Sequence, residues 1–158
     1  MVRCIDITGD LLDQKVEVIV NAWNRNIIPW WLLLPQGVSG AIKKRGGYAP
    51  FRELSGLGAI PLGGAVITGP GRLPFKAIIH VCGINMFWLT SERAIRDCVR
   101  NALNLAGEKR FTSIALPLIG AGTGGHSPDR VTQYMREEIA LSDYQGEVRL
   151  VRFGRDER

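Results

Sequence analysis

The densest group of glycines in this 158-residue chain is Gly120–Gly125, where four of six residues are glycine. Glycine adopts positive φ and has no side chain, so successive backbone N–H groups in such a loop can surround an anion. A helix predicted just beyond Ser127 would add the favourable dipole of its N-terminus. A turn is the simpler alternative, but a turn needs only one or two glycines. The loop therefore predicts phosphate binding, although it lacks the Lys-Ser/Thr pair of a nucleoside-triphosphate P-loop.

Three further polar residues follow other predicted strands. Asn21 and Asn24 end an apolar segment, and a carboxamide both donates and accepts, which suits sugar hydroxyls. Asp10 follows Gly9, where its carboxylate could accept a hydrogen bond from an adenine amino group. Simpler interpretations stay open for each, because loop asparagines often bind their own backbone and an aspartate after a turn often caps a helix.

Strands and helices alternate along the chain and predict how these residues are positioned. Apolar runs predict strands at Val2–Ile7, Val16–Asn21, Ala65–Thr68, Lys76–Val81, Ser113–Leu118 and Val148–Phe153. Helices are predicted at Leu11–Lys15, Gly37–Arg45, 91–106 and 127–141, with a loop-rich connection at 48–63 that has room for one short helix. This alternation implies an α/β sheet covered on both faces, and ligands bind such sheets at the carboxyl ends of the strands.

Composition limits the class of protein. Twenty basic and fifteen acidic side chains give a net charge of +5, which suits an anionic partner. The longest apolar run, Ile27–Leu34, is too short to span a membrane, and the first residues carry no signal-peptide pattern. The three cysteines lack metal-binding spacing and are odd in number, so neither a metal site nor a disulfide framework is predicted. We expect one cytoplasmic domain spanning residues 1–158.

These elements, in this order, resemble the macrodomain family over residues 5–153. The matching segments are Ile7–Leu11, Val16–Asn24 with its Asn-Ala-x-Asn ending, Gly37–Ile42, Gly64–Thr68, Leu73–His80 and Ala115–Gly125. The resemblance implies a three-layer α/β/α fold with a central mixed sheet and a cleft for ADP-ribose, with no cofactor and no metal.

The resemblance also implies roles for individual residues. Asp10, with Leu11 beside it, would hold the adenine amino group, while Asn21 and Asn24 would serve the sugar hydroxyls and Asn24 would be the catalytic residue. The remaining ligand-binding residues come from two loops, which are Gly37, Val38 and Ser39 in the first and Gly120, Ala121, Gly122, Thr123, Gly124, Gly125 and His126 in the second.

The chain departs from the hydrolytic branch of that family in both loops. Ser39 stands where hydrolytic macrodomains carry an aspartate that positions or activates water, and serine is no carboxylate base. The longer, apolar segment Arg25–Gln36 replaces a run of glycines, and Gly124 stands where an aromatic side chain often packs on the distal ribose.

Two functions follow from this pattern. The leading one is hydrolysis of an ADP-ribosyl or O-acetyl-ADP-ribose linkage, with water attacking the anomeric carbon or the acetyl ester. The alternative is a non-catalytic reader of ADP-ribose or of ADP-ribosylated macromolecules. RNA binding through the basic surface is a weaker third reading, which predicts a steep loss of affinity with salt.

Three side chains near the predicted cleft keep several interpretations. Trp30 and Trp31 would form an apolar lid, stack on the ligand or bind a partner protein. His126 would carry a proton or serve as a hydrogen-bonding loop residue.

Overall fold

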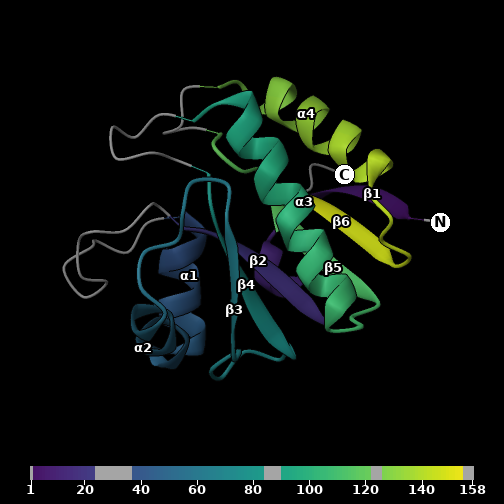
Figure 1. Cartoon of the computed structure of the whole chain (residues 1–158). Coiled ribbons are helices and arrows are strands. Elements are labelled where there is room, and N and C mark those ends of the chain that lie inside the picture. The colour runs from purple at the N-terminus through teal and green to yellow at the C-terminus, as the bar shows by residue number, and fades with distance from the viewer. Residues whose placement is uncertain (1, 24–36, 84–89, 122–125, 155–158) are drawn as a thin grey trace.

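The computed structural model describes residues 2–23, 37–83, 90–121 and 126–154. Six strands form one sheet in the order β1-β6-β5-β2-β4-β3 (Figure 1). Neighbouring strands run parallel except β3, which is antiparallel to β4, so the sheet is mixed. The strands are β1 (Arg3–Gly9), β2 (Val18–Trp23), β3 (Ala65–Thr68), β4 (Ala77–Cys82), β5 (Ser113–Pro117) and β6 (Glu147–Phe153).

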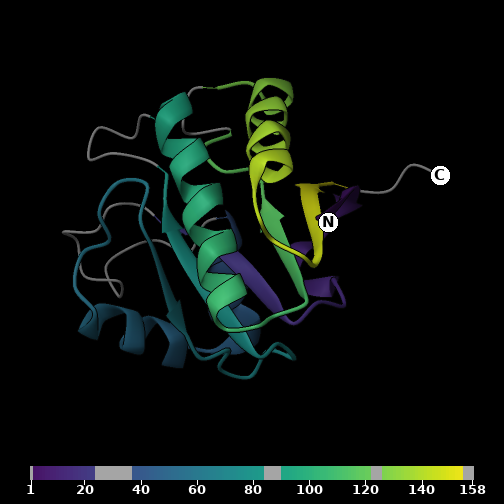
Figure 2. The ribbon, with the colours of Figure 1, turned by 45° about the vertical axis from the view of Figure 1, so that its right-hand side comes forward.

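Helices cover both faces of this sheet (Figures 1 and 2). One face packs against α3 (Glu92–Glu108) and α4 (Pro128–Leu141), with Ile95, Val99 and Met135 buried in that core. The other face packs against a 3₁₀ helix, η1 (Leu11–Asp13), and against α1 (Gly37–Gly46) and α2 (Ala49–Gly56). The molecule is therefore the α/β/α arrangement that the sequence predicts.

Serine side chains start the two helices of the first face. Ser91 Oγ accepts a hydrogen bond from Ala94 N, and Ser127 Oγ accepts one from Arg130 N. Each bond satisfies a backbone N–H that has no partner inside its helix. Pro128 follows Ser127 as the first helical residue, where its missing N–H costs nothing.

Two predicted segments differ from what the structure shows. The expected helix Leu11–Lys15 is a single 3₁₀ turn ending at Asp13, because Gln14 already has extended backbone angles. The connection 48–63 contains a complete eight-residue helix, α2, with Pro50 in its first turn. Phe51 and Leu54 stand three residues apart on the buried face of α2, a spacing that places them side by side on a helix.

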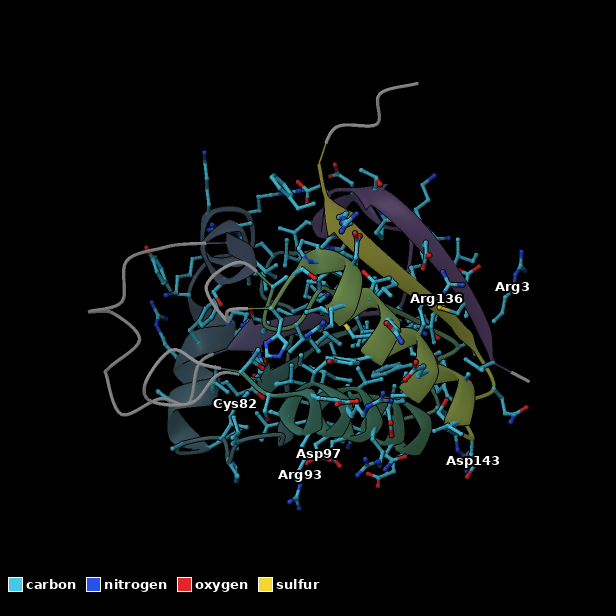
Figure 3. The ribbon with its side chains drawn as sticks, turned by 90° about the horizontal axis from the view of Figure 1, so that it is seen from above. Arg3, Cys82, Arg93, Asp97, Arg136 and Asp143 are labelled. Carbon is cyan, nitrogen blue, oxygen red and sulfur yellow. The ribbon has the colours of Figure 1, made fainter. Side chains whose placement is uncertain are left out.

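The parallel strands place their carboxyl ends at one edge of the sheet. Figure 3 shows Cys82, the last residue of β4, and Arg3, the first residue of β1, toward opposite sides of the molecule. Segments that follow β1, β2, β4 and β5 therefore start at the same edge, which we call the carboxyl edge. Among the described residues, no helix is both long enough and apolar enough to cross a membrane.

Candidate functional site

A cavity of about 740 Å³ opens at the carboxyl edge of the sheet. It brings together four of the residues that the sequence analysis assigns to ligand binding, namely Asp10, Leu11, Val38 and Ala121. They come from three segments that are far apart in the sequence. The other lining residues are Leu12, Ala41, Pro117, Leu118, Pro128, Val151, Arg152 and Phe153.

Asp10 both caps η1 and faces this cavity. Its Oδ1 accepts a hydrogen bond of 2.9 Å from Leu12 N, and its Oδ2 lies 3.7 Å from Nη1 of Arg45. Arg45 makes its shorter contact, 3.1 Å, with Asp13. A carboxylate offers about four lone-pair positions. Capping therefore leaves Asp10 with room to accept a hydrogen bond from a ligand, and the two sequence interpretations of Asp10 are compatible.

Phe153 and Arg152 line the cavity although the sequence analysis assigns them no function. Phe153 ends β6 with its side chain 87% exposed, while Arg152 donates a hydrogen bond of 2.9 Å to Asp129 of α4. An aromatic ring left in water at the carboxyl end of a strand is available to stack on a ligand. The sequence does contain a signal for Phe153 as a ligand-binding residue. Ligands bind at the carboxyl ends of strands, and Phe153 is the last residue of the final predicted strand.

Ser39 lies in the first turn of α1, next to Val38. Its Oγ donates a hydrogen bond of 2.8 Å to Oδ1 of Asn21, and the Asn21 amide nitrogen lies 3.0 Å from Nδ1 of His80. Asn21 is fully buried. Both ends of the Asn21 amide therefore bind protein groups, and its predicted contact with a ligand stays a prediction.

The segment that follows β5 contains a glycine with positive φ. Gly120 has φ of +80°, and a Cβ there would stand 2.8 Å from Cγ2 of Thr90. Ala121 and His126 form an isolated parallel bridge. The His126 ring packs edge-on against Tyr134, and its buried Nδ1 has no hydrogen-bond partner among the described residues.

Several predicted residues stand outside the described part of the chain. The catalytic candidate Asn24 and the aromatic pair Trp30 and Trp31 belong to residues 24–36. The loop residues Gly122, Thr123, Gly124 and Gly125 form a second such segment. Gly37 is the first residue of α1.

The sequence model of the Macro domain family matches residues 20–135 of this chain. This chain belongs to the Macro domain family. Within the described residues, no group of three or more His, Cys, Asp or Glu side chains could hold a metal ion.

Other macro domains resemble the chain over most of its length. A macro domain-containing protein of Listeria monocytogenes is 34% identical and covers 93% of this chain and 86% of its own. A Klebsiella pneumoniae protein named O-acetyl-ADP-ribose deacetylase is 36% identical, and the match covers 80% of this chain and 73% of the Klebsiella protein. The solved macrodomain of Oceanobacillus iheyensis with ADP has a TM-score of 0.75 and 30% identity, and covers 94% of this chain and 82% of its own.

Proposed function

We propose that this macro domain binds ADP-ribose in the cavity, with the adenine beside Asp10 and the distal ribose toward Ser39. The observation that carries the proposal is that Asp10, Val38 and Ala121 meet around one cavity of about 740 Å³. Ligand pockets commonly have volumes of roughly 300–1,000 Å³. The Oceanobacillus relative supports the assignment, since its solved forms include one with ADP and a variant with ADPR.

The adenine end offers one polar and one apolar contact. Asp10 would accept a hydrogen bond from the amino group of the base, using a lone pair that Leu12 N does not occupy. Phe153, whose ring is exposed at the cavity, would stack on the base. Such stacking contributes about 1–3 kcal/mol per base in other proteins.

The diphosphate would lie between the starts of two helices. Val38 stands in the first turn of α1 and Pro128 is the first residue of α4, and both line the cavity. Backbone N–H groups and the helix dipole make an N-terminus favourable for anions. The first turn of α1 has no acidic residue, and Asp129 in the first turn of α4 is paired with Arg152. Neither helix therefore presents an unpaired carboxylate to the phosphates.

We further propose that the domain hydrolyses ADP-ribosyl or O-acetyl-ADP-ribose linkages, with Asn24 holding the attacking water. The Klebsiella relative named O-acetyl-ADP-ribose deacetylase supports this step. Attack at the anomeric carbon passes through an oxocarbenium-like transition state. Because Ser39 is not a carboxylate, substrate distortion and the diphosphate oxygens of the ligand would have to assist.

A reader without catalysis is the second candidate, and the contact of Ser39 favours it. Ser39 Oγ donates its hydrogen bond to Asn21 Oδ1 at 2.8 Å, and an amide oxygen accepts a hydrogen bond but is not a base that would deprotonate Ser39. Activation of water needs a base near the reacting atom. A reader would keep the same binding contacts and release nothing.

One paired experiment separates these functions. Calorimetry with ADP-ribose tests binding, and release from Glu-linked, Ser-linked and O-acetyl substrates tests hydrolysis. For an enzyme, we expect Asn24→Ala to lower turnover far more than affinity, because a water-positioning contact acts mainly in the transition state. Binding without release from any substrate would establish the reader, and absence of ADP-ribose binding would contradict the proposed function altogether.

A further inference from the structure

A chain of hydrogen bonds runs from Ser39, the neighbour of the cavity-lining residue Val38, to the edge strand β3. Ser39 Oγ lies 2.8 Å from Asn21 Oδ1, and Asn21 Nδ2 lies 3.0 Å from His80 Nδ1. His80 Nε2 lies 2.8 Å from Thr68 Oγ1, which lies 3.0 Å from the carbonyl oxygen of Gly69. Asn21, His80 and Thr68 are all buried, so their polar atoms depend on one another for partners.

Such a chain has two possible directions. In the first, Ser39 donates to Asn21, Asn21 donates to His80, His80 donates to Thr68, and Thr68 donates to Gly69. In the second, every bond between Ser39 and Thr68 is reversed by turning the amide of Asn21 and moving the ring proton of His80 to Nδ1. Distances between heavy atoms do not distinguish the two directions. The direction has to be inferred from which atoms at the ends of the chain can donate and which can only accept.

The carbonyl of Gly69 selects the first direction. The hydroxyl of Thr68 has one proton. If Thr68 donates that proton to Gly69, it must accept from His80 Nε2, and all four bonds form. In the reverse direction the same proton goes to His80, and the bond to Gly69 is lost.

The protonation of His80 agrees with this direction. Burial without compensating charge lowers the pKa of His80 to about 3, so the ring is neutral near pH 7. A neutral imidazole has one donor and one acceptor nitrogen. That is what a ring between the amide of Asn21 and the hydroxyl of Thr68 requires.

We propose that Thr68 and His80 are positioning residues that hold Ser39, the neighbour of the cavity-lining residue Val38, as a hydrogen-bond acceptor for the ligand. Ser39 donates its hydroxyl proton to Asn21, so only the lone pairs of Ser39 Oγ remain for a ligand. This rests on the proposed function, and it specifies the contact: Ser39 accepts from a hydroxyl of the distal ribose. Ionised phosphate oxygens only accept hydrogen bonds, so they cannot form one with the acceptor Ser39 Oγ.

The direction can be measured in the ligand-free protein. The chain has two histidines, so a long-range ¹H–¹⁵N spectrum with His126→Asn as the assignment variant identifies the His80 ring. We expect a neutral ring protonated at Nε2 in the wild type. In Thr68→Val the Nε2 proton would be a buried donor without a partner, so we expect the proton to move to Nδ1. Protonation at Nδ1 in the wild type, or at Nε2 in Thr68→Val, overturns the inference.

Measuring ligand affinity tests whether Ser39 accepts a hydrogen bond from the distal ribose. We expect Ser39→Ala and Thr68→Val each to weaken ADP-ribose binding about fivefold, the loss of one neutral hydrogen bond. ADP, which lacks the distal ribose, should bind all variants equally, and Thr68→Ser should bind ADP-ribose as the wild type does.

A double variant distinguishes positioning from general damage. If Thr68 acts through Ser39, the affinity of Ser39→Ala/Thr68→Val for ADP-ribose equals that of Ser39→Ala alone. Additive losses, or an equal loss for ADP, overturn the inference. A wild type that does not bind ADP-ribose contradicts the proposed function instead, and the histidine spectrum still decides the direction of the chain.

Discussion

The carboxyl edge and the opposite edge, where the parallel strands begin and which we call the amino edge, use their polar groups differently. At the amino edge these groups bind one another, with Glu17 at the centre. Its carboxylate accepts from Thr112 N at 2.6 Å and from Thr112 Oγ1 at 2.7 Å, and it pairs with the ammonium of Lys76. Its backbone N–H donates to Ser113 Oγ at 2.8 Å. One residue thus joins the starts of β2, β4 and β5.

At the carboxyl edge, polar and aromatic groups keep part of their capacity for a ligand. Asp10 caps η1 and still faces the cavity, Ser39 keeps its lone pairs, and Phe153 is exposed. Under the proposed function, the amino edge would supply stability and the carboxyl edge would supply binding. Substitutions at the amino edge should therefore change the free energy of unfolding, and those at the carboxyl edge should change affinity.

The largest effect is expected at Gly120, which follows β5 at the carboxyl edge. Its backbone angle also makes it important for stability. In Gly120→Ala a Cβ at φ of +80° would stand 2.8 Å from Cγ2 of Thr90, whose hydroxyl is itself bonded to the carbonyl of Gly83. Backbone strain and overpacking together should lower the free energy of unfolding by about 2–4 kcal/mol in urea titrations.

Gly107→Ala is the matched control for Gly120→Ala. An added Cβ at Gly107 of α3 meets no atom within 4 Å, so this change should stabilise the protein by up to about 1 kcal/mol. Equal stabilities of the two variants would show that Gly120 is not required by its backbone angle.

Glu17→Gln should lower the free energy of unfolding by about 1 kcal/mol at neutral pH and leave ADP-ribose affinity unchanged. Its bonds to Lys76 and then to Thr112 lower the pKa of Glu17 from 4.5 to about 2. Because the folded pKa lies below the unfolded one, the carboxylate stabilises the protein above about pH 4.5, and this contribution is lost as pH falls toward 2.

Unfolding of the wild type and Glu17→Gln should be compared from pH 7 downward. The difference between them should shrink across that acidic window. A difference that stays constant with pH would mean that the charge of Glu17 does not stabilise the amino edge.

The smallest effect is expected from Phe153→Ala, which should weaken ADP-ribose binding about fivefold through lost stacking. Stability should not change, because the side chain is 87% exposed. Leu141→Ala, which removes another exposed apolar side chain at the end of α4, should alter neither property. An unchanged affinity in Phe153→Ala would remove the ring from the adenine site.

Local sequence patterns predicted the fold and part of the cavity. Strand alternation, the Ser127-Pro128 helix start and the glycine-rich loop depend on neighbouring residues, and the structure shows the helix of α4 where it was expected. The role of Asn21 was not predictable in this way. It depends on His80, which is 59 positions away, and on Ser39 in the first turn of α1, and no local pattern encodes such pairs.

Discrimination between ADP-ribose and inosine diphosphate ribose tests the central claim most directly. Hypoxanthine carries a carbonyl where adenine carries the amino group, so Asp10 would face an acceptor. By calorimetry, the wild type should bind ADP-ribose at least about tenfold more tightly. Asp10→Asn should lose this preference, because an amide both donates and accepts, whereas Asp13→Asn on the same 3₁₀ turn should keep it. Equal binding of both ligands by the wild type, or an undiminished preference in Asp10→Asn, would contradict the placement of adenine beside Asp10.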